Sequence, residues 1–336
     1  MLVTREYRSI IEARQALSGA LDRANVPGFF DRIDWFDLLH SHSLSEQPVR
    51  ILQAAEGDRQ TWIFLIAPKA NRLSALANWY SFAWAPVFVG APDPPTQQRL
   101  VEAVARYLLK DSAQIDLYPV TNATDLLLDA FRRAGWFGVQ RPMGGRHLLH
   151  LQPGEDFAAY WAGRPGRLRN LVKRKARASR FTLSIHDRLT DALWRDYVAV
   201  QSRSWKAEEP GLDFLHALAV HESAAGTLRL GFARLDDQPV AAQYWTVENN
   251  VALIHKLAHD RAFDGASPGT LLSHAMFAAA IDGDGARLID YGTGDNGYKK
   301  DWMTERTTLQ RLDFFNPRFA SSWLPAARTA ISALVG

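Results

Sequence analysis

Three consecutive residues, Ser267, Pro268 and Gly269, are typical of the start of a helix that a ligand can reach. Serine is a favourable N-cap, proline fits the first helical position, and glycine has no side chain to keep a ligand from the backbone amides. Because free N–H groups and the helix dipole attract anions, we expect a pyrophosphate at Gly269, Thr270 and Leu271. Ser-Pro-Gly also begins helices that bind nothing, so the motif alone leaves both interpretations open.

Four ionisable residues, Asp290, Asp295, Tyr298 and Lys299, follow one another closely at the expected C-terminal end of a short parallel strand. Ligands of α/β proteins usually bind at this edge of the sheet. A carboxylate can take a proton from an attacking amine, and a tyrosine hydroxyl can protonate a thiolate leaving group, so Asp290 is the candidate base and Tyr298 the candidate acid. The alternative is a local Asp290–Lys299 salt bridge beside a buried tyrosine.

The positive charge of the chain is concentrated in residues 164–180, which hold eight Lys and Arg and no acid. Without them the chain has 31 basic residues against 36 acidic ones. On a helix, Arg169, Arg174 and Arg177 could form an anion patch, since guanidinium groups match phosphate oxygens. A solvated amphipathic helix is the alternative, and no helix-turn-helix, zinc-finger or RNA-recognition signature accompanies the segment.

Several other chemistries are excluded or disfavoured. The chain has no Cys, which removes disulfides, thiol nucleophiles and Cys-ligated metals. His255 and His259 are expected on a strand, where residues four apart lie ~13 Å apart, so we predict no metal site there. Residues 292–297 match G-x-G-x-x-G, but the chain after them is too short for a dinucleotide-binding fold.

The second half shows a clear order of elements. Apolar runs at 227–235, 240–247 and 251–259 are separated by turn-forming Asp and Asn residues, which predicts a three-stranded antiparallel meander. A helical run over 271–281 and a short strand over 287–291 follow. Such a crossover places the last strand parallel to the third strand of the meander.

The length of 336 residues, with 47% hydrophobic and 22% charged residues, is that of a globular protein with two domains. Pro and Gly cluster at 140–154, and we place the domains at 1–150 and 151–320, with a helical tail at 321–336. The first residues carry charges where a signal peptide is apolar, so we expect a cytoplasmic protein. The richest apolar stretch, 79–90, is too short to span a membrane.

The second half resembles the GNAT acyltransferase superfamily, and within it the CelD-like acetyltransferases of cellulose and exopolysaccharide biosynthesis, which are related to Fem-type peptidyltransferases. The resemblance covers positions 169 to 315, while the first half has the general look of a degenerate copy of the same fold. The matching residues are Arg169-Asn170, Ser204-Trp205-Lys206, Pro239-Val240-Ala241-Ala242, Lys256-Leu257-Ala258-His259-Asp260, Ser267-Pro268-Gly269-Thr270-Leu271-Leu272, Asp290-Tyr291-Gly292-Thr293-Gly294 and Tyr298-Lys299-Lys300-Asp301-Trp302.

The resemblance implies a tandem GNAT-like α/β fold, with a mixed sheet flanked by helices in each half. It implies acetyl-CoA or another acyl-CoA as co-substrate, bound at residues 267–271 with Lys299 as a further contact, and no metal. The acceptor would be an amine, or less often a hydroxyl, on a sugar or envelope precursor. We expect the acceptor to contact Trp205, Lys206, Gln243, His255 and Asp295.

Two other functions remain open at this point. One is a Fem-type transferase that uses aminoacyl-tRNA, with the basic segment 164–180 holding the RNA; nucleic acid is a partner only in this case. The other is a binding module without catalysis in a polysaccharide-synthesis assembly, for which the 11 Trp residues offer faces that suit sugars. The oligomeric state and the acceptor are not determined by the sequence.

Overall fold

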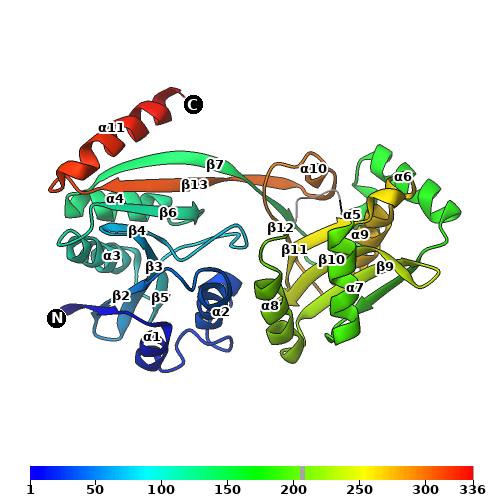
Figure 1. Cartoon of the computed structure of the whole chain (residues 1–336), viewed down its shortest axis with the longest axis horizontal. Helices are drawn as coiled ribbons and strands as arrows, with labels where there is room; N and C mark the ends of the chain where they lie inside the picture. The colour runs from blue at the N-terminus through cyan, green and yellow to red at the C-terminus, as the bar shows by residue number, and fades with distance from the viewer. Residues whose placement is uncertain (205–208, 336) are drawn as a thin grey trace. The chain divides into compact units, whose positions relative to one another are not determined.

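The computed structural model describes residues 1–204 and 209–335 and divides the chain into two compact units (Figure 1). Unit 1 is Met1–Gly144 together with Thr308–Gly336, and unit 2 is Gly145–Thr307. Each unit is built on a mixed sheet with helices packed on it, so the predicted fold class is confirmed. Within the described residues, no helix has the length and apolar character needed to cross a membrane.

Unit 1 has the strand order β1-β2-β3-β4-β6-β13, and β5 pairs with β3. Its strands are β1 (Leu2–Tyr7), β2 (Val49–Glu56), β3 (Arg59–Lys69), β4 (Arg72–Ala75), β5 (Val87–Val89) and β6 (Gln114–Val120), with parts of β7 (Phe137–His150) and β13 (Glu305–Phe315). Its helices are α1 (Ile10–Leu17), η1 (Phe29–Asp31), α2 (Ile33–Ser43), α3 (Pro94–Leu108), α4 (Thr124–Ala134) and α11 (Ala320–Val335). The parallel pair β4–β6 is joined through helix α3, as a crossover requires.

The end of the chain returns to unit 1, which differs from the predicted boundary at residue 320. Strand β13 pairs antiparallel with β6, from Gln310 opposite Val120 to Phe315 opposite Gln114. Phe314 of β13 stacks on Phe131 of α4 with a centroid distance of 4.1 Å. Pro and Gly punctuation cannot reveal this pairing, because the strand that completes the first sheet lies almost 200 residues away from its partner.

Unit 2 has the strand order β7-β12-β11-β10-β9-β8. Its further strands are β8 (Thr182–His186), β9 (Leu228–Leu235), β10 (Gln238–Glu248), β11 (Val251–His259) and β12 (Leu288–Thr293). Its helical segments are α5 (Phe157–Ala162), α6 (Gly166–Ala178), α7 (Asp191–Ser202), α8 (Leu212–Ala224), η2 (Arg261–Ala266), α9 (Pro268–Ala278), η3 (Ala279–Gly283) and α10 (Lys299–Trp302). The predicted meander is confirmed as β9-β10-β11, and β12 pairs parallel with β11 as expected.

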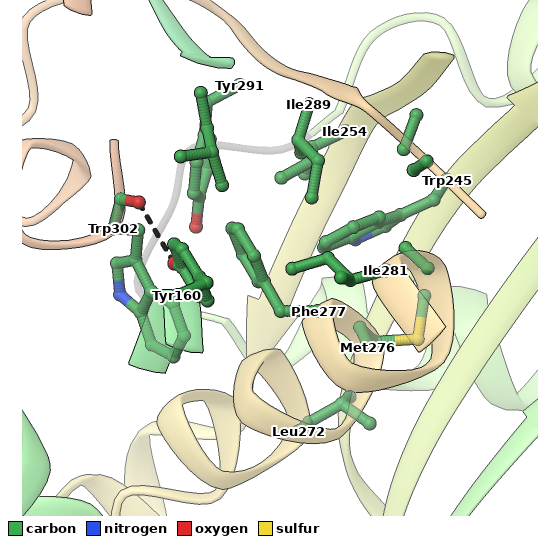
Figure 2. Packing of buried hydrophobic residues seen from close by; sticks show 14 of the residues in the cluster. Tyr160, Trp245, Ile254, Leu272, Met276, Phe277, Ile281, Ile289, Tyr291 and Trp302 are labelled. Atoms are coloured by element: carbon green, nitrogen blue, oxygen red, sulfur yellow. Dashed lines mark hydrogen bonds between the residues drawn. The ribbon is translucent and has the colours of Figure 1, made fainter. Parts of the chain in front are cut away.

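Helices cover both faces of the unit 2 sheet. On β10, Tyr244 contacts Tyr197 of α7, with ring centroids 6.3 Å apart, whereas the next residue, Trp245, contacts Phe277 of α9 at 5.2 Å. Successive residues of a strand point to opposite faces, so α7 and α9 lie on opposite sides of the sheet. The larger apolar cluster is on the α9 side, where Figure 2 shows Tyr160, Phe277 and Trp302 packed together.

Candidate functional site

Strands β11 and β12 separate after a short region of pairing. The parallel ladder runs from Val251 opposite Leu288 to Leu253 opposite Asp290. Both strands continue beyond it, but among the described residues they do not pair with each other there. The register between β10 and β11 shifts in the same region, because Tyr244 faces Lys256 whereas Trp245 faces Ile254. A bulge bends its strand and increases the local twist. The two strands therefore diverge and leave a wedge between them.

A cavity of about 430 Å³ lies in this wedge. Its walls are formed by residues of β11 and β12, of η2, of the start of α9 and of the segment around α10. The lining residues are Leu257, His259, Asp264, Ser267, Gly269, Thr270, Ser273, Tyr291, Tyr298 and Trp302. This volume is within the range of small-molecule sites. The predicted anion site at the start of α9 and the candidate acid Tyr298 thus line the same cavity.

Helix α9 begins as the sequence predicts, but with fewer available N–H donors. Ser267 occupies the N-cap position with φ 57°, its side chain makes no capping hydrogen bond, and its N–H donates to the carbonyl groups of residues 263 and 264. Pro268 has no N–H, and the N–H groups of Thr270 and Leu271 both donate to the Ser267 carbonyl at 3.2 Å. Of the described backbone donors in this turn, the Gly269 N–H is the one left for a ligand.

Gln243 on β10 holds the start of α9 in place through hydrogen bonds. It is buried on β10, and its Nε2 donates to Ser273 Oγ at 2.7 Å and to the Gly269 carbonyl at 3.2 Å. Trp245 Nε1 donates to Gln243 Oε1 at 3.0 Å, which fixes the amide orientation. The residue predicted to contact the acceptor therefore positions the helix start instead of lining the cavity.

Two tyrosines form the wall of the cavity on the side of β12. Tyr291 is buried, and its ring lies edge-on to that of Tyr298 with centroids 5.9 Å apart. Desolvation raises the pKa of Tyr298 to about 12, and it also raises the pKa of Tyr291 well above its ordinary value. Both hydroxyls are therefore protonated at neutral pH and can donate hydrogen bonds.

Asp290 is fully buried, and both of its oxygens are engaged. Oδ2 accepts from Arg146 Nε at 2.8 Å and Nη2 at 2.5 Å, and Oδ1 accepts from the Gly292 N–H at 2.9 Å. Asp290 does not line the cavity. This geometry gives Asp290 a role in joining β7 to the end of β12, and nothing in it supports proton transfer by the predicted base.

Lys299 and Asp295 also lie outside the lining of the cavity. The Lys299 ammonium is buried and donates to the carbonyl groups of Tyr291 at 3.0 Å and Thr293 at 2.6 Å, and desolvation lowers its pKa to about 8. Lys299 anchors α10 to β12 in place of the expected contact with a phosphate. Asp295 is exposed and paired with Arg306, which lowers the pKa of Asp295 to about 2.

The remaining predicted residues lie on other parts of the unit. His255 is on the α7 side of the sheet, where its Nε2 is 2.9 Å from Thr246 Oγ1 and desolvation lowers its pKa to about 4. The predicted acceptor contacts Trp205 and Lys206 lie outside the described residues. The basic segment is helix α6, where Arg169, Arg174 and Arg177 are exposed.

Six lining residues were not among the predicted site residues: Leu257, His259, Asp264, Ser273, Tyr291 and Trp302. His259 Nε2 and Asp264 Oδ1 are 2.7 Å apart, and Trp302 packs on Phe277. The sequence analysis placed His259 in a disfavoured zinc pair with His255 and among the residues of the family resemblance, but gave it no role in the site. Its place at the end of β11, five residues before an aspartate in a loop, is the signal that could have indicated the pair. Among the residues that the structure describes, no group of three or more His, Cys, Asp or Glu is arranged to hold a metal.

The corresponding crossover helix of unit 1 does not offer an anion site. Helix α3 begins with Pro94 and Pro95, which have no N–H, and the Asp93 side chain caps the Thr96 N–H at 3.0 Å. At the N-cap, unit 1 has a carboxylate where unit 2 has Ser267, and at the second helical position it has Pro95, without an N–H, where unit 2 has Gly269. The residues that favour a ligand are thus in unit 2.

Comparisons with known proteins agree with this geometry. Residues 165–300 match the family described as acetyltransferase (GNAT) domain, and this range lies within unit 2. A search of curated proteins gave no match. The solved structure of FemX is 10% identical with a TM-score of 0.61 and covers 94% of this chain and 98% of its own.

Two further structures are similar over the whole length. A tandem GNAT protein from the clavulanic acid biosynthesis pathway is 13% identical with a TM-score of 0.52, covering 93% of this chain and 98% of its own. A conserved protein of unknown function from Bacteroides thetaiotaomicron is 12% identical with a TM-score of 0.57, covering 94% of this chain and 99% of its own. At these identities the likeness is one of fold. Residues 165–300 therefore match an acetyltransferase (GNAT) domain, and the chain shares its fold with FemX and with a tandem GNAT protein.

Proposed function

We propose that the protein is an acyl-CoA-dependent N-acyltransferase whose donor, acetyl-CoA or another acyl-CoA, binds in the cavity between β11 and β12. The observation that carries the proposal is the coincidence of three features in one cavity: a diverging strand pair, the start of α9 and a tyrosine hydroxyl. The matched acetyltransferase (GNAT) domain over residues 165–300 supports the same conclusion.

The cavity fits the donor in shape and chemistry. An extended pantetheine arm would lie in the wedge that opens where β11 and β12 separate, beyond Leu253 and Asp290. At the other end, the Gly269 N–H and the hydroxyls of Ser267 and Thr270 are donors for a diphosphate. Leu257, Tyr291 and Trp302 contribute apolar wall surface that suits the acyl group.

Transfer in this site would be direct. The acceptor nitrogen forms a bond to the thioester carbonyl carbon, the carbon–sulfur bond breaks, and the proton lost by the amine is balanced by the one gained by the thiolate. We assign Tyr298 as the hydrogen-bond donor to the developing thiolate, because its raised pKa keeps the hydroxyl protonated. Positioning of the amine and the thioester supplies much of the acceleration, and Asp290 has no proton-transfer step.

The acceptor class rests on sequence resemblance. The likeness to CelD-like acetyltransferases supports an amine on a sugar or envelope precursor.

The test is turnover with acetyl-CoA and a panel of amino sugars, followed by the release of free thiol. Tyr298→Phe should lower kcat by about 10- to 100-fold, the worth of one hydrogen bond to a charged group, while acetyl-CoA affinity changes little. Tyr80→Phe, a buried tyrosine of unit 1, is the matched control. Unchanged kcat in Tyr298→Phe would remove the assigned role, and no transfer to any acceptor would favour the binding module without catalysis.

A second candidate is a transferase that uses aminoacyl-tRNA, and the surface of α6 favours it. Lys173, Arg174 and Arg177 are exposed and form no ion pair with another described residue. Lys175 on the same helix donates to the carbonyl of Gly265, the neighbour of the cavity residue Asp264, so α6 lies beside the cavity. Binding of tRNA that weakens steeply with salt, and is lost in Arg174→Glu, would support this candidate over acyl-CoA.

A further inference from the structure

The pair formed by His259 and Asp264 stands beside the start of α9, inside the cavity. His259 is the last residue of β11, Asp264 is in η2, and the distance from Nε2 to Oδ1 is 2.7 Å. The other ring nitrogen, Nδ1, lies against Gly269, where an added Cβ would approach it to 3.3 Å. Nδ1 therefore lies beside the backbone of Gly269, and both residues line the cavity.

The start of α9 needs an additional donor if it is to hold a diphosphate. A helix ordinarily leaves its first four N–H groups without intrahelical partners. Here the N–H groups of Ser267 and Thr270 are used within the turn, Pro268 has none, and Gly269 keeps the one available amide. Two phosphoryl groups would meet a single backbone donor and two hydroxyls, which is a weak anion site by this standard.

The groups around the His259 ring determine whether its Nδ1 can donate a hydrogen bond to an anion. Asp264 on η2 accepts at Nε2, and Lys175 of α6 donates to the carbonyl of the neighbouring Gly265. Tyr291 and Tyr298 on the opposite wall remain neutral, because burial raises the pKa of both. With a proton on Nε2 for Asp264, a neutral imidazole has a lone pair at Nδ1 and repels an anion, whereas an imidazolium donates there.

We propose that His259, oriented by Asp264, is a ligand for the diphosphate of the donor, and that donor binding is coupled to uptake of one proton at Nδ1. This inference rests on the proposed function, since it concerns the same cavity and the same co-substrate. His259 then supplies the additional hydrogen-bond donor that the start of α9 lacks. Donor affinity then falls as pH rises, because Nδ1 without its proton has no hydrogen to donate to the diphosphate.

The test is calorimetric titration with acetyl-CoA at pH 8, in buffers that differ in their enthalpy of ionisation. The dependence of the observed heat on the buffer measures the protons taken up, and we expect between about 0.5 and 1 per donor bound. Dephospho-CoA keeps the diphosphate but lacks the 3′-phosphate, and it should give the same proton uptake. That result would show that the protons are not taken up by the 3′-phosphate.

Variants locate the proton. His259→Asn should bring the uptake close to zero and weaken binding at pH 6.5 by about 10- to 100-fold, since a charged hydrogen bond is lost. His150→Asn is the matched control, because His150 forms a comparable pair with Glu305 at 3.4 Å but is exposed and does not line the cavity. Its uptake should equal that of the wild type.

The outcomes separate this inference from the function on which it rests. Acetyl-CoA binding without dependence on the buffer, or with full uptake in His259→Asn, would overturn the role of His259 and leave the donor site intact. No binding of any acyl-CoA by the wild-type protein at pH 6.5 or pH 8 would overturn the proposed function and this inference with it.

Discussion

The buried ion pair between Arg146 and Asp290 allows a decision between structural and catalytic roles for Asp290. The Asp290 side chain is 0% exposed and that of Arg146 is 17% exposed, and they are joined by two hydrogen bonds of 2.8 and 2.5 Å. Removing one partner of a buried pair leaves the other charge without compensation, which costs about 3–5 kcal/mol. Asp290→Asn should therefore lower the free energy of unfolding by about 3 kcal/mol, with the amide still able to accept from Gly292.

The double variant makes the prediction sharper. In Asp290→Asn with Arg146→Met, neither charge remains in the interior, so the loss should be smaller than the sum of the two single losses by about 2 kcal/mol. The assay is urea denaturation followed by circular dichroism. The control is Asp196→Asn, which breaks the more exposed Arg234–Asp196 pair and should cost at most about 1 kcal/mol.

Two results would refute this reasoning. One is an Asp290→Asn protein that unfolds within about 1 kcal/mol of the wild type but has lost turnover by more than about 100-fold, as expected of a base. The other is additive loss in the double variant, which would mean that the two side chains do not stabilise one another.

Three further predictions concern buried polar groups. Gln243→Leu should lower the free energy of unfolding by about 2–4 kcal/mol in urea denaturation, because Ser273 and the indole N–H of Trp245 lose their partner; an unchanged midpoint would contradict the anchoring role. Lys299 has its pKa lowered by desolvation from 10.5 to about 8, so the unfolded chain binds more protons between these values. The stability of the wild type relative to Lys299→Met should then rise between pH 8 and 10.5, by at most about 3 kcal/mol, and a flat difference would contradict it. His255, with its pKa lowered by desolvation from 6.5 to about 4, should make the wild type lose stability as pH falls from 6.5 to 4, and His255→Phe should flatten this part of the curve in thermal unfolding.

Local patterns predicted the meander of unit 2 well, because its turns are specified by neighbouring residues. Asp236, Asp237, Asn249 and Asn250 all adopt positive φ, between 46° and 67°, as two-residue hairpin turns require. The strands observed at Leu228–Leu235, Gln238–Glu248 and Val251–His259 begin and end within two residues of their predicted limits.

Long-range pairing could not be predicted in the same way. The return of β13 to unit 1 depends on partners in β6 almost 200 positions earlier, and the sequence around β13 carries no sign of them. The candidate site shows the same difference between local features and long-range contacts. The start of α9 was identified from Ser267, Pro268 and Gly269, whereas the pairing of Asp290 with Arg146 depends on a strand 144 positions away.

Side-chain placement decided which predicted residues reach the cavity. Tyr298 does so, but Lys299, its neighbour, points to the carbonyl groups of β12, because a short helix turns successive side chains about 100° apart. The position of His259 beside Asp264 was not predicted either, since Asp264 lies in the six-residue 3-10 segment η2, which is too short to show a periodic pattern.

The central claim is that the cavity at the start of α9 binds an acyl-CoA, and one titration tests it most directly. Acetyl-CoA is titrated into the wild-type protein and into Gly269→Glu, which adds a negative charge at the proposed diphosphate site; a separation of about 5 Å between the two charges is assumed. At an effective dielectric constant of about 20, one such repulsion costs about 3 kcal/mol, or a loss of affinity of about 100-fold.

The matched control is Gly283→Glu, which adds the same charge at the far end of the helical run, where nothing lies within 4 Å of an added Cβ. We predict that the wild type and Gly283→Glu bind acetyl-CoA equally and that Gly269→Glu binds it at least about 100-fold more weakly. Equal affinity in all three proteins, or none in the wild type, would contradict the claim.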